Sequence, residues 1–306
     1  MIQSLLTILH ILAAQLTGSP LPATSAVTGV AAVPVVEERF VAPQLAPLPQ
    51  LTQQGDAANL QLSARSAVVY DAETNKTLYH KSATSPVKMA SITKLMTALV
   101  ALDLEPDLNK IVTIPDGVQY IAPSVMGLRR GEKVTVRELM AGMLIKSGND
   151  AATVLAWDAG GGSLSNFVER MNLKAKALGM DKTVFANPHG LDMPEAHSTA
   201  EDVARMAAFA FQNPVVRELG GTRQMTVVSH DYSRTTHYLV NSDKLLSENI
   251  GIIAGKTGFT DEAGLCLVVL VERNGHKIIS VVLGSEDRAE DSRRLIDWTY
   301  NHYNWN

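Results

Sequence analysis

A chain of 306 residues that is 46% hydrophobic and 19% charged can bury a substantial core, as one large domain or two small ones. Its net charge of −4, without a basic block, gives no indication of binding to nucleic acid or to an anionic membrane surface. The single cysteine excludes an internal disulfide, and Cys266 lies in an apolar run that predicts a buried side chain. The eight histidines are not spaced as metal ligands, so we predict no metal and no other cofactor.

The N-terminal residues 1–26 predict a secretory signal peptide. An apolar stretch from Leu5 to Leu16 is too short to span a bilayer, and small residues typical of a cleavage region follow it. The preceding residues contain no lysine or arginine, which leaves a disordered or buried N-terminal segment as the alternative. Residues 27–60 are rich in proline, alanine, valine and glutamine and predict an extended linker. The folded domain is therefore expected over residues 61–306 of a secreted protein.

The domain is predicted to begin with a β-hairpin and a buried helix. The strand-like segments Ala67–Tyr70 and Thr77–Tyr79 flank the turn residues Glu73–Lys76. From Ser91 to about Leu102, apolar residues occur nearly all round a helix, which indicates that this helix is buried.

The middle of the chain predicts four further helices. They begin at the capping box Thr135–Glu138, at Asn149 or Asp150, at about Leu164, and at a second capping box, Ser198–Glu201. The last of them should end before Pro214, because proline cannot continue a helix.

Strands return after about residue 220, at Met225–Val228 and Ile250–Ala254. The segments Gly264–Val271 and Lys277–Leu283 flank an Asn-Gly turn, a strong hairpin signal, and a closing helix follows over about residues 287–303. Strands thus come from both ends of the chain and helices from its middle. We predict an α/β fold of the α+β kind: one antiparallel sheet built from both termini, with flanking helices and an inserted all-helical lobe.

Ser91 and Lys94 form an S-x-x-K motif in which both side chains lie on one face of the predicted helix. A serine needs an adjacent base to act as a nucleophile, and a buried lysine can lose its proton. A second S-x-x-K begins at Ser85, but Pro86 follows it and Lys88 precedes the apolar run. We therefore predict Ser91 as the nucleophile and Lys94 as its base.

Two more motifs follow in the chain, Ser147-Gly148-Asn149 and Lys256-Thr257-Gly258. The first lies at a predicted helix junction, where a hydroxyl and an amide can face the site. The second closes a predicted strand and offers a cation and a hydroxyl to a substrate carboxylate, with a glycine where a ligand backbone can lie along the strand edge. S-x-x-K, S-x-N and K-T-G in this order are the signature of class A β-lactamases and penicillin-binding proteins.

The chain resembles the low-molecular-weight penicillin-binding proteins, the serine D-alanyl-D-alanine carboxypeptidases and endopeptidases of bacterial cell walls. The resemblance extends over about residues 62–300, and residues 90–97, 130–152, 187–191 and 255–264 carry it. It implies a β-lactamase/transpeptidase-like fold, a location in the periplasm or cell envelope, and peptidoglycan stem peptides and cross-links as substrates. It also implies β-lactam antibiotics as acylating inhibitors.

The resemblance implies three catalytic residues. Ser91 would be acylated by the penultimate D-alanine carbonyl, Lys94 would be its general base, and Ser147 would relay a proton toward the leaving amine. The backbone N–H groups of Ser91 and Phe259 would form the oxyanion hole.

The resemblance also implies substrate-binding residues. Asn149 would hold the peptide backbone, Lys256 and Thr257 would engage the terminal carboxylate, and Gly258 would leave room for the ligand. His189 lies between proline and glycine in the third matching segment, and we interpret it as a turn residue rather than a catalytic one.

The closing helix is followed by only a few residues, so the chain resembles the short, soluble members of the family and predicts no stable membrane anchor. Phe259, where some members carry histidine, also suits this group. One alternative is a serine β-lactamase, which would need a deacylating carboxylate; the local sequence supports neither Glu169 nor Glu195 in this role. The other alternative is a non-catalytic penicillin-sensing or peptidoglycan-binding module, against which the intact motifs argue.

Overall fold

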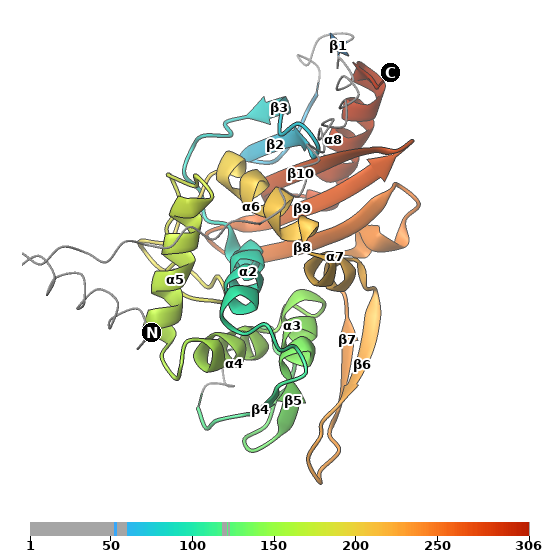
Figure 1. Ribbon diagram of the computed structural model, residues 1–306. Helices are drawn as coiled ribbons and strands as arrows, with labels where there is room; N and C mark the ends of the chain where they lie inside the picture. The colour runs from blue at the N-terminus through green and yellow to red at the C-terminus, as the bar shows by residue number, and fades with distance from the viewer. Residues whose placement is uncertain (1–51, 54–59, 118–120, 122, 306) are drawn as a thin grey trace, which may run out of the picture. The chain divides into compact units, whose positions relative to one another are not determined.

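The computed structural model describes residues 52–53, 60–117, 121 and 123–305. The predicted signal peptide lies outside these residues, as does the predicted linker except residues 52–53 and 60. A central antiparallel sheet has the strand order β3-β2-β10-β9-β8 (Figure 1). Its strands are β2 (Ser66–Asp71), β3 (Thr77–Lys81), β8 (Ile252–Thr260), β9 (Gly264–Arg273) and β10 (His276–Ser285). Because β2 pairs with β10, strands from both ends of the chain meet in one sheet, as predicted.

The two faces of this sheet pack against different helices, because successive side chains of a strand point to opposite faces. On β2, Val68 and Tyr70 join the core that includes α2 (Lys94–Leu104) and α6 (Ala200–Gln212). Ala67 and Val69 instead join the core beneath α8 (Arg288–His302). Figure 1 shows α2 and α6 on one side of the sheet and α8 on the other.

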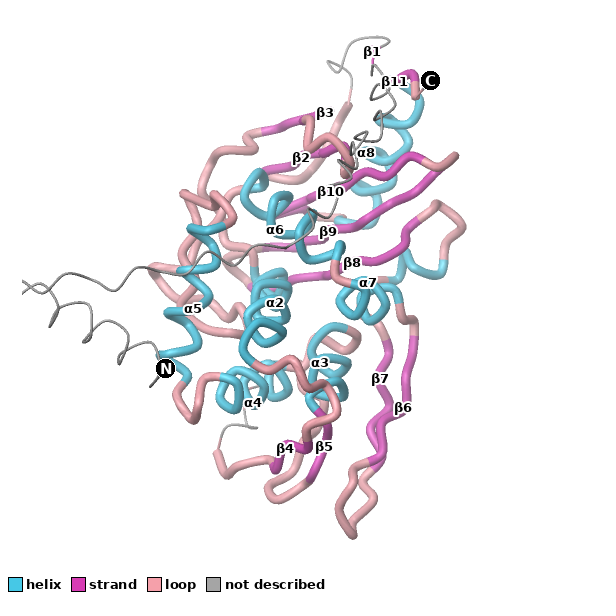
Figure 2. Tube along the Cα trace, viewed as in Figure 1, coloured by secondary structure: helices cyan, strands magenta, loops and turns pink. Residues whose placement is uncertain are grey.

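The segment between β3 and β8 is not the all-helical lobe that the sequence predicts. Besides α2 and α6, it holds the helices α3 (Val136–Leu144), α4 (Asn149–Ala159), α5 (Leu164–Ala177) and α7 (Pro214–Gly221). It also holds two small antiparallel sheets, β4 (Ile111–Thr113) with β5 (Lys133–Thr135), and β6 (Gln224–Val228) with β7 (Thr236–Val240) (Figure 2). The strand predicted at Met225–Val228 is confirmed as β6. The strands β4, β5 and β7 are not predicted, because strands of three to five residues are too short to give a secure period-two pattern. No helix among the described residues is long and apolar enough to cross a membrane.

Several predicted helix boundaries shift by a residue or a turn. The capping box at Thr135 is confirmed, with both of its hydrogen bonds to Glu138 present. At α6 the capping residue is Thr199 rather than Ser198, because the Thr199 hydroxyl accepts from the Asp202 N–H. Asn213 ends α6 and caps α7, a helix that the sequence does not predict because Pro214 was expected to end helical structure.

The remaining short elements lie at the ends of the described chain or beside the sheet. They are β1 (Thr52–Gln53), paired with β11 (Tyr303–Asn304), and the 3₁₀ turns η2 (Ala90–Thr93) and η3 (Lys244–Ser247). Both 3₁₀ turns adjoin β8, which brings them close to the residues of the predicted site.

Candidate active site

Ser91 lies in the 3₁₀ turn η2, which leads directly into α2. The prediction that Ser91 begins an α-helix is wrong, because α2 starts only at Lys94. In a 3₁₀ turn the side chains of residues i and i+3 eclipse one another. The turn therefore brings the two side chains together, and Lys94 Nζ donates a hydrogen bond to Ser91 Oγ at 2.8 Å.

Lys94 is completely buried, and three oxygen atoms hold its amine. Besides Ser91 Oγ, Nζ contacts Asn149 Oδ1 and the backbone oxygen of His189, each at 2.7 Å. Burial is the main reason that the pKa of Lys94 lies well below its usual value, and the nearby charge of Lys256 lowers it further. Such a lysine gives up its proton more readily than an exposed one, so it can act as a base toward the serine.

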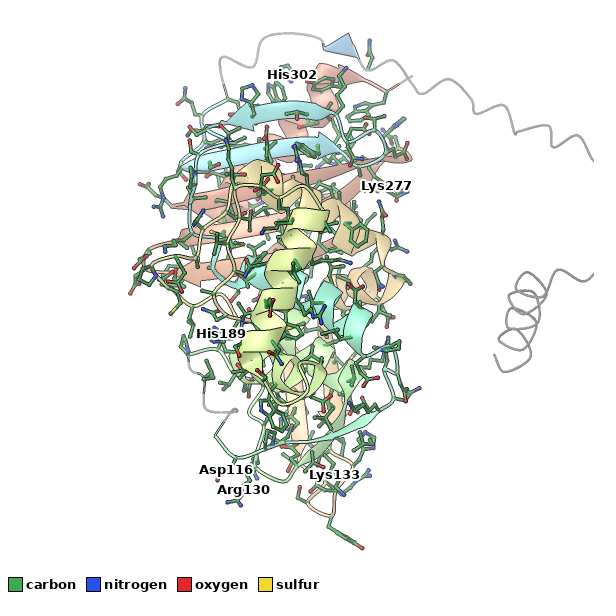
Figure 3. All side chains as sticks on the ribbon, turned by 60° about the vertical axis from the view of Figure 1, so that its left-hand side comes forward. Asp116, Arg130, Lys133, His189, Lys277 and His302 are labelled. Atoms are coloured by element: carbon green, nitrogen blue, oxygen red, sulfur yellow. The ribbon has the colours of Figure 1, made fainter. Side chains whose placement is uncertain are left out.

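The backbone carbonyl of His189 belongs to the site, although the sequence does not predict it. It accepts from Lys94 Nζ at 2.7 Å and from Ser91 Oγ at 3.4 Å. Figure 3 labels His189 in the loop between α5 and α6. Asn187 shapes this turn, because its Oδ1 accepts from the N–H groups of His189 and Gly190. Burial lowers the pKa of the His189 imidazole to about 4, so the ring is neutral at pH 7.

Gly190 holds this loop against η2. Its φ is +86°, and a Cβ at this position would lie 2.0 Å from the backbone oxygen of Ala90. We expect Gly190→Ala to push the loop away, to slow acylation of Ser91 about tenfold or more, and to lower the free energy of unfolding by about 2 kcal/mol or more. Penicillin-labelling rates and thermal unfolding measure the two effects.

Gly161→Ala is the matched control for this substitution. Gly161 also has a positive φ, +67°, but nothing lies within 4 Å of an added Cβ. It should cost about 1 kcal/mol of stability and leave acylation unchanged. Equal acylation rates in the two variants would contradict the positioning of the site by Gly190.

A second serine–lysine pair joins the S-x-N and K-T-G motifs. Lys256 Nζ donates to Ser147 Oγ and to the backbone oxygen of Thr257, both at 2.8 Å. Ser147 has a φ of +62°, in the left-handed region that residues other than glycine rarely adopt. A strained residue of this kind costs about 1–3 kcal/mol and persists where its surroundings fix it, which is common in active sites.

Asn149 and Asp150 form the first turn of α4, whose N-cap is Gly148. The prediction that Asn149 or Asp150 caps this helix is wrong, because both side chains are used elsewhere. The amide oxygen of Asn149 accepts from Lys94. The carboxylate of Asp150 is fully buried and accepts from three successive N–H groups, those of Met126, Gly127 and Leu128. Asp150 thereby ties the loop at residues 126–128 to the site.

Lys256 is also buried, and its burial, aided by the charge of Arg288, lowers its pKa to about 7. The negative charge of Asp243 has the opposite effect and raises the pKa of Lys256. Lys256 therefore gives up its proton more readily than an exposed lysine, and a bound anion would favour its charged form. Arg288, at the start of α8, donates to the backbone oxygen of Gly258 at 2.8 Å. The sequence does not predict that Arg288 lies beside the K-T-G motif, because no motif surrounds this arginine.

The K-T-G motif lies within β8, which corrects the prediction that it closes a strand. At Gly258 an added Cβ would lie 3.2 Å from the backbone nitrogen of Ser91, so the strand packs tightly on η2. Thr257 Oγ1 lies 2.5 Å from Ser242 Oγ. Phe259 follows with 58% of its surface exposed.

The second S-x-x-K match has different surroundings. Lys88 donates to the backbone oxygen of Met193 at 2.5 Å and lies 3.7 Å from Glu262.

Cys266 is fully buried, as predicted, and burial raises its pKa to about 11, which makes it a poor nucleophile. The described part of the chain contains no cluster of three or more side chains suited to hold a metal ion.

The fold and the site together define a class of protein. Beside an antiparallel sheet, a serine in η2 is bonded to a buried lysine at the start of α2. A second pair joins Lys256 on the edge strand β8 to Ser147, which lies between α3 and α4. This is the arrangement of an active-site serine enzyme with the S-x-x-K, S-x-N and K-T-G signature.

Comparison with known proteins gives the family. The D-alanyl-D-alanine carboxypeptidase family, peptidase family S11, matches residues 52–287. The D-alanyl-D-alanine endopeptidase of Pseudomonas aeruginosa is 35% identical over 247 residues, which are 78% of this chain and 77% of that protein. The D-alanyl-D-alanine carboxypeptidase DacF of Bacillus subtilis is 33% identical over 258 residues, 80% of this chain but only 64% of that longer relative.

Solved structures agree with this assignment. The crystal structure of the Streptomyces K15 DD-transpeptidase superposes with a TM-score of 0.75 at 31% identity, covering 79% of this chain and 98% of that one. The chain therefore belongs to the serine D-alanyl-D-alanine carboxypeptidase/endopeptidase family and has the DD-transpeptidase fold.

Proposed function

We propose that this enzyme cleaves D-alanyl-D-alanine peptide bonds of peptidoglycan stem peptides through an acyl-enzyme on Ser91, in the periplasm or cell envelope. The observation that carries the proposal is the 2.8 Å hydrogen bond between Ser91 Oγ and the fully buried amine of Lys94. The names of the relatives, D-alanyl-D-alanine carboxypeptidases and endopeptidases, support the substrate class.

In the proposed acylation step, neutral Lys94 takes the proton of the Ser91 hydroxyl as Oγ attacks the carbonyl of the penultimate D-alanine. The N–H groups of Ser91 and Phe259 stabilise the developing oxyanion. The tight packing of Gly258 on the Ser91 nitrogen supports this pairing, because it holds the two segments that carry the donors side by side.

The second serine–lysine pair, Ser147 and Lys256, is proposed to act on the leaving group of the substrate. Ser147, bonded to Lys256 at 2.8 Å, passes a proton to the departing amine. Asn149 holds the peptide backbone, while protonated Lys256 and the hydroxyl of Thr257 bind the terminal carboxylate. Water then hydrolyses the ester on Ser91.

We also propose that β-lactams acylate Ser91 and are released slowly. Rapid release, as in a β-lactamase, would need a carboxylate that activates water at the ester. Ser91 Oγ contacts Lys94 and the His189 carbonyl, whereas the carboxylate of Asp150 is taken up by three backbone N–H groups. These contacts favour a peptidase over a β-lactamase.

Digestion of purified muropeptides, read by mass spectrometry, tests the proposal. Loss of one D-alanine from a pentapeptide would show carboxypeptidase activity, and conversion of cross-linked dimers to monomers would show endopeptidase activity. The Ser91→Ala variant is run in parallel and should give neither product. If the wild-type protein releases nothing from either substrate, it is a binding module and the proposal is wrong.

A further inference from the structure

His237 is a buried histidine outside the three motifs, on strand β7 of the β6–β7 hairpin. Its side chain is only 3% exposed, and that of Glu132, in the loop before β5, is 1% exposed. The ring nitrogen Nε2 is hydrogen-bonded to Glu132 Oε1, and Nδ1 lies 3.3 Å from the backbone oxygen of Met126. Figure 1 shows the hairpin beside β5, and the His230 N–H donates to the backbone oxygen of Lys133 at 2.7 Å. Both ring nitrogens of His237 therefore face oxygen atoms of one loop.

These contacts require a proton on each ring nitrogen of His237. A backbone carbonyl can only accept a hydrogen bond, so Nδ1 must donate to the oxygen of Met126. An ionised carboxylate also only accepts, so a second proton must lie between Nε2 and Glu132. Imidazole is a stronger base than a carboxylate, and this proton therefore belongs to the ring. His237 is thus an imidazolium ion in a buried pair with Glu132, whose other oxygen accepts from the Arg129 N–H at 2.9 Å.

The electrostatic surroundings of His237 agree with a charged ring. The charged groups that act on it in the described part of the chain are both acidic, Glu132 on the loop and Asp150 on α4. Its cross-strand neighbour on β6 is Val227, which carries no charge. The hydrogen bond to Glu132 is the main reason that the pKa of His237 lies above its usual value, and burial acts in the opposite direction.

Met126 connects this pair to the S-x-N motif. Its backbone oxygen faces His237, and its N–H donates to Asp150 Oδ1 at 2.7 Å. A Cβ added to Gly148, the middle residue of the motif, would lie only 2.9 Å from the Met126 nitrogen. Asn149, the last residue of the motif, accepts from the buried amine of the S-x-x-K lysine. The loop that His237 holds on one side therefore packs against the S-x-N motif on the other.

We propose that His237 is a positioning residue for acylation, which as an imidazolium holds the loop at residues 126–132 on β7 and thereby keeps the S-x-N motif in place. The pairing stands on the contacts of the two ring nitrogens, whereas its effect on acylation rests on the proposed function.

Loss of the ring proton would place the lone pair of Nε2 against the Glu132 carboxylate and separate the loop from β7. The pKa of His237 in the folded protein lies above its usual 6.5. The stability that the pair contributes is therefore complete below about pH 6.5 and is lost as the pH rises through the folded-state pKa.

Glu132→Gln separates the charge of the pair from its hydrogen bonds. The glutamine oxygen can accept from the Arg129 N–H while its amide group donates to Nε2 of a neutral ring, so the loop stays bonded at alkaline pH. His237→Gln removes the pairing itself, because one amide group cannot donate to oxygen atoms on two sides. His230→Gln is the matched control, since it removes an exposed histidine–glutamate pair, with Glu138, from the same hairpin.

The charge of the ring is tested by NMR on the full-length protein with ¹⁵N-labelled histidine, with His237→Gln to assign the signals. Wild-type His237 should have both ring nitrogens protonated at pH 7. Its titration midpoint should fall by about one pH unit or more in Glu132→Gln, the effect of losing an adjacent opposite charge. A ring that is neutral at pH 7, or a midpoint that is unchanged in Glu132→Gln, would overturn the inference.

The positioning role is tested by the rate at which penicillin labels Ser91, counted per folded molecule and followed against pH. His237→Gln should slow labelling about tenfold, within the 10²-fold that a displacement of about 1 Å can cost. His230→Gln and Glu132→Gln should keep the wild-type rate at pH 7, and Glu132→Gln should lose less of it at alkaline pH.

A His237→Gln protein that melts at a lower temperature but labels at the wild-type rate would show a purely structural role and refute the positioning. If this variant does not fold, Glu132→Gln decides: alkaline losses of stability and labelling as large as those of wild type would refute the inference. A wild-type protein with a charged His237 ring that forms no adduct at Ser91 would contradict the proposed function and leave the histidine–glutamate pair intact.

Discussion

Replacing Ser91 by alanine should lower the rate of D-alanine release by about four orders of magnitude or more, because no acyl-enzyme can then form. The hydroxyl accepts a hydrogen bond from Lys94 and lies next to the S-x-N and K-T-G residues, so no other serine can take its place without moving the backbone. The measurement is release of D-alanine from a short acyl-D-alanyl-D-alanine peptide under saturating conditions.

Ser85→Ala provides the matched control, since Ser85 begins the other S-x-x-K sequence. Its lysine, Lys88, bonds to the backbone oxygen of Met193. We expect Ser85→Ala to retain full activity. A loss in Ser85→Ala comparable to that in Ser91→Ala would show that the wrong serine has been assigned.

Replacing Lys94 by methionine should slow acylation of Ser91 by about 10²- to 10⁴-fold, the usual contribution of a general base. Methionine fills a similar volume in the core but cannot take up a proton. In the wild-type protein the base is available only above the pKa of Lys94, and burial lowers that pKa. The acidic limb of the acylation rate should therefore lie at a lower pH than for an exposed lysine. Stopped-flow labelling with a fluorescent penicillin measures the rate at each pH.

The Lys94→Arg variant distinguishes the role of Lys94 as a base from the role of its positive charge. Arginine keeps a cation and hydrogen-bond donors for Asn149 Oδ1 and the His189 carbonyl, but it does not deprotonate in proteins. If a neutral amine is required, this variant should be as inactive as Lys94→Met at every pH. Activity within tenfold of wild type in a folded Lys94→Arg protein would refute the general-base role.

The elements that the sequence predicts well are those with local signals. The hairpin at the start of the domain follows from two strand-like segments around a run of turn residues, and the α3 start follows from a capping box whose two partners are three residues apart. The same holds for the S-x-x-K pair, because three residues of separation bring two side chains together in any helical turn. The central strands β9 and β10 could be predicted because each is apolar over most of its length.

The parts that the sequence does not predict depend on contacts between distant residues. The carbonyl of His189 reaches Ser91 across 98 positions, and Arg288 reaches Gly258 across 30. The left-handed backbone of Ser147 has no signature, since serine rarely adopts that conformation. His237 has no motif around it, and only the fold shows that it pairs with Glu132.

Acylation of the intact protein by a penicillin, located by peptide mapping and mass spectrometry, tests the central claim most directly. The account predicts one adduct per molecule, on the peptide that contains Ser91, which accumulates and persists because no carboxylate contacts Ser91 Oγ among the described residues. An adduct on another residue, or rapid turnover of the drug without any adduct, would contradict it.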